Sequence, residues 1–262
     1  LLTGLSKDTA IPVQRVKAEL SAVKAEITTL GQRDGLQQLM RFRLTPDSTA
    51  LEMDVEIRRT ADGAPLRMSG LFTLYSQRSL SPFSYSSYAP SATLGFEHRK
   101  IDRHDTGSLI SGLMPADWNI LVGSEQYPSG ISYGVQLQSA ELIKASGTRL
   151  ALPRFLAVFP DYSLHGWMSR PLWLQSERLN WLSMIQNQFM DLDKNERLLA
   201  RFRIVVGKRS DVAAVTDQIY RGPVLRGYSN HSDVSFSIRD EDQIPVTQVR
   251  PDADGSFTVR LP

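Results

Sequence analysis

The chain has no cysteine among its 262 residues and only four histidines. The absence of cysteine excludes a disulfide framework, thiolate metal sites and a cysteine nucleophile. It contains no uninterrupted apolar run of about 18 residues, so we expect no membrane span. The formal net charge is only +2, and nucleic-acid binding needs clustered Lys and Arg, so we expect no nucleic-acid partner.

The signatures of the common enzyme classes are missing as well. The chain has no Gly-x-Ser-x-Gly elbow, phosphate loop or dinucleotide fingerprint, so no cofactor is expected. It begins at Leu1 without an initiator Met and without a basic stretch followed by an apolar one. We expect a processed chain or a piece of a longer one, whose partner would be another domain. The lack of cysteine fits the cytosol and the periplasm equally, and we favour a periplasmic or secreted protein.

What the chain does have is alternation of apolar and charged residues. Leu51, Met53, Val55 and Ile57 alternate with charged residues, and 40–44 and 200–204 follow the same rule. A period of two places apolar side chains on a core and charges in water, which is typical of a β-sheet with one wet face. Outward arginines are expected at positions 41, 43, 58 and 59.

The pattern predicts a mainly β protein, a large antiparallel β super-sandwich with one or two short helices. Its clearest helix is 211–220, with Asp211 as the capping residue. A Ser-, Tyr- and Pro-rich stretch, 76–95, is expected to be a loop. Residues 1–225 form the predicted sandwich domain, and 226–262 the start of a small β appendage or domain that stops short.

Residues 11–30 fit two structures. Val16, Leu20, Val23 and Ile27 recur at spacings of three and four, and Val-Lys-Ala-Glu occurs twice seven residues apart, as in a helical heptad. The same stretch alternates as two strands would. Because the following segments are β, we favour strands, and the helical alternative would make this segment an oligomerisation element.

Charged and histidine residues gather at 97–105, which includes His98 and His104. Such groups can act as acids and bases near neutral pH. The simpler interpretation, which we prefer, is a solvated strand or loop, and no metal-ligand spacing accompanies it. A calcium-loop-like segment, 191–196, lacks the required Gly and Glu and is predicted to be a turn.

Two aromatic segments, 118–133 and 159–167, combine rings with polar neighbours. Stacking aromatics beside polar and charged groups suit sugar binding, although Trp and Tyr also commonly cap sandwich ends. We predict a ligand site where 97–105 meets these two segments. Its candidate substrate-binding residues are Trp118, Tyr127, Arg154, Tyr162 and Trp167. The catalytic residues are unknown, and the weak candidates are His98, His104, Tyr162 and His165.

Several segments together resemble the β super-sandwich domains of carbohydrate-active enzymes, of the galactose-mutarotase-like type. The C-terminal β domain of family 38 α-mannosidases is the nearest example. The segments that carry this resemblance are 23–27, 38–44, 51–57, 132–137 and the apolar stretch that ends at 160–162. The tail, with 238–246 and 254–257, resembles a carboxypeptidase-regulatory-type β domain. The mutarotase His and Glu pair has no matching motif here, so no functional residue is carried over.

The resemblance implies a carbohydrate-associated β-sandwich that is a non-catalytic or substrate-binding part of a larger glycan-processing enzyme, with carbohydrate as its partner. Two alternatives stay open. One is a stand-alone mutarotase or polysaccharide lyase that uses His, Tyr and Arg, so that whether the chain is an enzyme is undecided. The other is a structural or oligomerisation module with an N-terminal helix.

Overall fold

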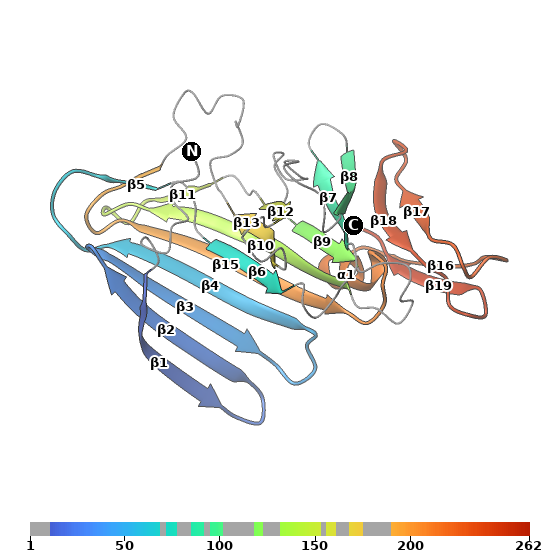
Figure 1. Ribbon diagram of the computed structural model, residues 1–262, viewed down its shortest axis with the longest axis horizontal. Helices are drawn as coiled ribbons and strands as arrows, with labels where there is room; N and C mark the ends of the chain where they lie inside the picture. The colour runs from blue at the N-terminus through green and yellow to red at the C-terminus, as the bar shows by residue number, and fades with distance from the viewer. Residues whose placement is uncertain are drawn as a thin grey trace. The chain divides into compact units, whose positions relative to one another are not determined.

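In the computed structural model, the described residues form nineteen β-strands and one helix, most of which Figure 1 labels. The described residues are 11–68, 72–77, 85–91, 95–101, 118–122, 132–152, 156–160, 168–174 and 190–262. The fold is mainly antiparallel β with small additional sheets toward the C-terminus, which confirms the predicted fold class.

The largest sheet has ten strands, in the order β1-β2-β3-β4-β15-β10-β9-β7-β8, with β11 paired to β10. The chain divides into two compact units. Unit 1 comprises 1–73, 137–155 and 173–204, and unit 2 comprises 74–136, 156–172 and 205–262. Two long strands, β10 (Ser132–Ile143) and β15 (Arg197–Gly207), contribute residues to both units.

Unit 1 is built on an antiparallel meander that Figure 1 draws in blue. Its strands are β1 (Val13–Leu20), β2 (Ala25–Arg33), β3 (Leu36–Leu44) and β4 (Ala50–Arg59). Two short strands, β5 (Leu66–Met68) and β14 (Met190–Leu192), pair separately, and β11 (Arg149–Ala151) extends the hairpin from β10.

The expected alternation decides which face of β4 is inside. Met53, Val55 and Ile57 are buried, as predicted, whereas Leu51 is only half-buried. Phe202 of β15 is fully buried as well. The prediction for Arg59 was wrong: its side chain was expected to point outward, but it is buried. Its guanidinium donates hydrogen bonds to backbone carbonyl groups at positions 61 and 192, which compensates for the loss of water.

Residues 11–30 form strands, which confirms the favoured prediction and shows that the helical alternative was wrong. A two-residue turn, Asp34-Gly35, joins β2 to β3, and both residues have positive φ, 49° and 74°. This geometry is that of a type I′ turn, whose twist suits a hairpin. The turn fixes nine residues of β2 opposite β3. Tertiary pairing therefore outweighs the heptad spacing.

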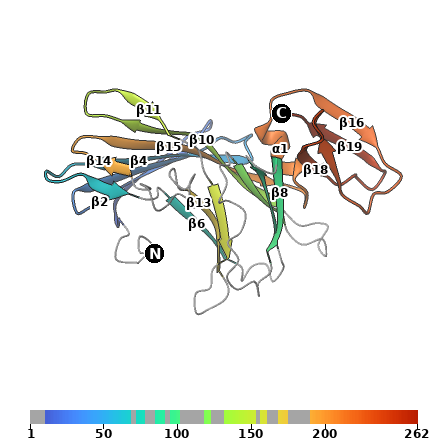
Figure 2. The same ribbon diagram turned by 90° about the horizontal axis from the view of Figure 1, so that it is seen from above.

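Unit 2 contains strands that the sequence did not predict. β7 (Tyr85–Ser91) lies inside the expected loop 76–95, and it pairs with both β8 (Gly95–Ile101) and β9 (Trp118–Val122). A further sheet consists of β12 (Leu156–Pro160), β13 (Met168–Leu174) and β6 (Phe72–Gln77), and Figure 2 labels β13 and β6 side by side. β12 lies against β9, so strands of both sheets meet in this unit.

The C-terminal part of unit 2 combines the predicted helix with two strand pairs. Helix α1 (Ala213–Ile219) packs against β18 (Pro245–Val249) and β19 (Ser256–Arg260). β19 pairs with β16 (Val224–Tyr228), and β18 pairs with β17 (Phe236–Arg239). A small core formed by Ala213, Val249 and Val259 joins them. The domain boundary between 225 and 226 stays a prediction, and it falls within β16.

Candidate functional site

Two of the predicted site residues lie in the described part of the chain. His98 belongs to β8 and Trp118 begins β9. The others lie outside the described residues; they are His104, Tyr127, Arg154, Tyr162, His165 and Trp167. The assignment of these residues to a ligand site stays a prediction.

The sheet register shows how the segments of the predicted site are arranged. β7 lies between β8 and β9, and Tyr88 of β7 is opposite both His98 and Ile120. Residues 97–101 and 118–122 are therefore one strand apart in the same sheet. Pro160, at the start of the second aromatic segment, ends β12, which lies against β9. Parts of all three segments belong to neighbouring strands of unit 2.

Trp118 is a buried residue that packs against another aromatic side chain. Its side chain is buried, and its ring meets Tyr220 edge-on, with the ring centroids 6.4 Å apart and the planes at 73°. The Tyr220 hydroxyl donates a hydrogen bond of 2.6 Å to the Val246 carbonyl oxygen. An edge-on pair of this kind stabilises a core. A sugar could stack on Trp118 only if the ring became exposed, so the other candidates of the aromatic segments are better placed to test the site.

Two carboxylates, one just before α1 and one within it, accept hydrogen bonds from backbone groups of the C-terminal segment. The Asp211 carboxylate accepts hydrogen bonds from the backbone N–H groups of Ala214 and Arg250, at 2.9 and 3.0 Å. Half-buried Asp217 accepts one from the backbone N–H of Arg260, at 2.6 Å. Burial raises the pKa of Asp217, and the hydrogen bond from Arg260 opposes that shift. These carboxylates have structural partners, and we assign them a structural role rather than a catalytic one.

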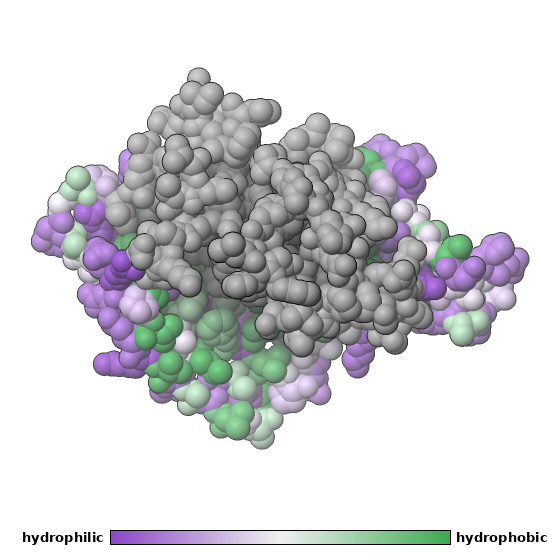
Figure 3. Space-filling view, viewed as in Figure 1, coloured by the Kyte–Doolittle hydropathy of each residue, from purple (hydrophilic) through white to green (hydrophobic). Residues whose placement is uncertain are grey.

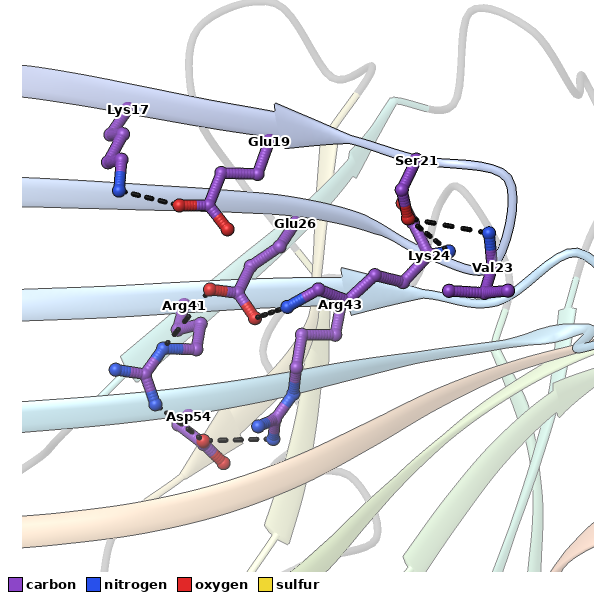
Figure 4. A network of polar contacts seen from close by, with 9 residues as sticks. All are labelled: Lys17, Glu19, Ser21, Val23, Lys24, Glu26, Arg41, Arg43 and Asp54. Atoms are coloured by element: carbon purple, nitrogen blue, oxygen red, sulfur yellow. Dashed lines mark hydrogen bonds and ion pairs between the residues drawn. The ribbon is translucent and has the colours of Figure 1, made fainter.

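A network of ion pairs covers the polar face of β2, β3, β4 and β15. Asp54 lies among three guanidinium groups, those of Arg43 at 2.9 Å, Arg201 at 3.2 Å and Arg41 at 3.8 Å. Arg41 also approaches Glu26, at 3.7 Å, and Figure 4 shows this chain of contacts. Because its oxygens are shared among these cations, Asp54 is poorly suited to act as a general base. The network was anticipated only as a solvated charged face.

On the same polar face of the sheet, Lys17 and Glu19 of β1 form a separate ion pair of 2.5 Å. Their hydrogen bond raises the pKa of Lys17 and lowers the pKa of Glu19. Both groups are exposed, and an isolated exposed pair contributes little to stability.

The opposite face of β1, β2 and β3 is apolar, and its side chains become more exposed from β4 toward β1. The register aligns Ala18, Ile27, Phe42 and Met53 in one row across the four strands. Met53 is fully buried, but Ile27 is 46% exposed, and on β1 the neighbouring Leu20 is 87% exposed. Figure 3 shows hydrophobic side chains gathered over this part of the meander. The apolar face therefore extends beyond the core.

Across the described ranges, no group of three or more His, Asp or Glu side chains is arranged to hold a metal ion. No helix in the described part of the chain is long and apolar enough to cross a membrane.

No protein-family model matches the chain, and no curated protein matches it in sequence. Solved structures do match its fold. The GH36 alpha-galactosidase AgaA from Geobacillus stearothermophilus, in complex with stachyose, has a TM-score of 0.53 and 7% identity, over 80% of this chain and 30% of that one. AgaB from the same organism has a TM-score of 0.51 and 8% identity, over 80% of this chain and 28% of that one.

A third match is a proposed aldose 1-epimerase from Klebsiella pneumoniae. It has a TM-score of 0.50 and 12% identity, over 78% of this chain and 57% of that one. The fold is therefore that of the galactose-mutarotase-like β-sandwiches, which confirms the resemblance in the sequence. At these identities the likeness concerns the fold, and this chain spans 30%, 28% and 57% of the three proteins named here.

Proposed function

We propose that this chain is a carbohydrate-associated β-sandwich, a non-catalytic or substrate-binding part of a larger glycan-processing enzyme. The observation that carries the proposal is the shared fold: about four fifths of the chain superposes on 30% of an alpha-galactosidase chain. A segment of that proportion corresponds to one domain among several. This comparison supports carbohydrate as the ligand class and another domain of a longer chain as the partner.

The chemistry of the aromatic segments supports a sugar as the ligand. Tyr162 and Trp167 offer rings for the apolar face of a pyranose, and Arg154 offers a planar donor for hydroxyl or carboxylate oxygens. Tyr127 adds a further ring to the same set. In the described part of unit 2, β9 and β12 are in contact, so the chain segments that lead toward these residues start from neighbouring strands.

The alternative is an enzyme in its own right, a mutarotase or polysaccharide lyase. The likeness to a proposed aldose 1-epimerase, which this chain covers to 57%, favours it. In such an enzyme His98 or His104 would be the acid or base, with Tyr162 or His165 as further candidates. The two functions differ in turnover: an accessory domain binds sugar without accelerating anomer interconversion or chain cleavage.

The test is oligosaccharide binding by the Trp167→Ala variant, measured by a glycan array and then by calorimetry on the glycan found. We expect the loss of one stacking ring to weaken binding by about 1 kcal/mol or more. Tyr228→Ala is the control, because Tyr228 is an aromatic residue that is 69% exposed and belongs to β16, outside the predicted site. The control should bind like the wild type.

Equal binding by wild type and Trp167→Ala would contradict the site. No binding to any glycan would contradict the proposed function. Accelerated mutarotation of galactose by the wild-type chain, lost in His98→Gln or His104→Gln, would establish the enzymatic alternative instead.

A further inference from the structure

Among the strands that the structure describes, none pairs with the outer edge of β1. β1 ends the strand order of the large sheet, its partner in the described ranges is β2, and all eight of its residues are exposed. An edge strand of this length presents unpaired backbone groups that can pair with another strand. Charged residues commonly prevent such pairing, so the arrangement of charges on β1 decides whether the edge is protected or complementary to something.

The charges of β1 are complementary to a second copy of β1. When two copies run antiparallel about a two-fold axis at Ala18, Lys17 of one lies opposite Glu19 of the other, and the reverse pair forms too. The polar faces of both copies then coincide, because directly opposite residues share a face. The Lys17–Glu19 ion pair of each copy then lies beside that of the other copy, so that two lysines and two glutamates alternate.

The apolar face matches in the same register. Val16 lies opposite Leu20 of the second copy, and these side chains are 62% and 87% exposed in one copy. A shift by one residue would place Lys17 opposite Ala18 and so mix charged and apolar faces. A two-fold axis at Glu19 would place Glu19 opposite Glu19, and an axis at Lys17 would place Lys17 opposite Lys17, although it would also place Arg15 opposite Glu19. Of these three registers, only the one centred on Ala18 has no pair of like charges directly opposite each other. The axis at Ala18 satisfies both faces.

We propose that the open edge of β1 pairs with β1 of a second copy of this chain, in the antiparallel register centred on Ala18. The pairing continues the sheet from one copy into the next and shields Val16 and Leu20 against each other. The proposal is independent of the function proposed above, because it rests only on the edge, its charges and its apolar residues.

Charge reversal tests the register. In Lys17→Glu, each copy has two acidic residues that face two acidic residues, and in Glu19→Lys each has two basic residues that face two basic ones. We expect either variant to weaken self-association by about tenfold or more. The doubly exchanged variant, Lys17→Glu with Glu19→Lys, keeps opposite charges facing and should associate like the wild type. Sedimentation velocity over a range of concentrations measures each dimer.

Mixing the two single variants provides the decisive comparison. Lys17→Glu and Glu19→Lys should form a mixed dimer, because acidic edge then faces basic edge. Loss of the ion pair within one copy cannot explain such a rescue. Raising the salt concentration should reduce the difference between variants, since exposed charges are screened.

Three results would overturn the proposal. They are a wild-type chain that stays monomeric at high concentration, single variants that dimerise like the wild type, and a mixture that forms no mixed dimer. Hydrogen exchange gives a further check: β1 amides should become protected as the concentration rises. Protection of β1 in a monomer would show that another segment covers this edge, which also overturns the proposal.

Discussion

Asp211 illustrates how one residue joins two parts of unit 2. Its side chain is fully buried, and its carboxylate accepts hydrogen bonds from the N–H groups of Ala214 in α1 and of Arg250. The guanidinium of Arg209 lies 3.3 Å away and compensates its charge. The sequence predicted a helix that starts at Asp211, because Asp before an amphipathic stretch is a start signal. The helix begins two residues later, at Ala213, with Val212 at its N-cap, and Asp211 accepts the Ala214 N–H from one position before that cap. The sequence did not reveal the partner 39 positions later.

We expect Asp211→Ala to lower the free energy of unfolding by about 2–4 kcal/mol, because it leaves two N–H groups, one of them at the start of α1, without their acceptor. Asp211→Asn should lose less, since its carbonyl oxygen can still accept from Ala214. Urea denaturation followed by circular dichroism measures both. A loss in Asp211→Ala below about 0.5 kcal/mol, the range of ordinary surface changes, would contradict this role.

At the scale of elements, the alternation of apolar and polar residues predicted those strands whose own sequence determines their conformation. β3 and β4 were predicted from alternation, and in the turn between them the Ser48 N–H donates a hydrogen bond to the Thr45 carbonyl oxygen. β7 was missed because its Ser- and Pro-containing stretch has no alternation, and it is a strand through pairing on both sides. The approach of β8 to β9 depends on that strand, so the arrangement of the candidate site could not be read from local patterns.

The row Ala18, Ile27, Phe42 and Met53 gives an element-scale prediction. Met53 is 0% exposed, so Met53→Ala should leave a cavity and cost about 2–5 kcal/mol. Ile27→Ala, on the same row but 46% exposed, should cost about 1 kcal/mol or less. Denaturant midpoints at constant slope compare the two variants. Equal losses would mean that the apolar face is covered as far as β2.

At the scale of the whole molecule, four strands contribute residues to both compact units: β6, β10, β13 and β15, of which β10 and β15 are the longest. β10 contributes 132–136 to one unit and 137–143 to the other, and β15 is divided between 204 and 205. If one unit unfolded alone, the backbone pairing of β10 and of β15 would stop in the middle of each strand. Backbone N–H and C=O groups at the end of the folded half would then lose their hydrogen-bond partners. We therefore expect one cooperative transition for the whole chain, in which circular dichroism and tryptophan fluorescence coincide.

Two variants already described test this expectation, because Met53 belongs to unit 1 and Asp211 to unit 2. In a single transition, Met53→Ala and Asp211→Ala must each lower the same midpoint, and the double variant must lose the sum of the two free energies, since distant sites are additive. Two separate transitions, one moved by Met53→Ala and the other by Asp211→Ala, would contradict the expectation. They would show that β10 and β15 can break between the units, and that each unit owes its stability to its own core.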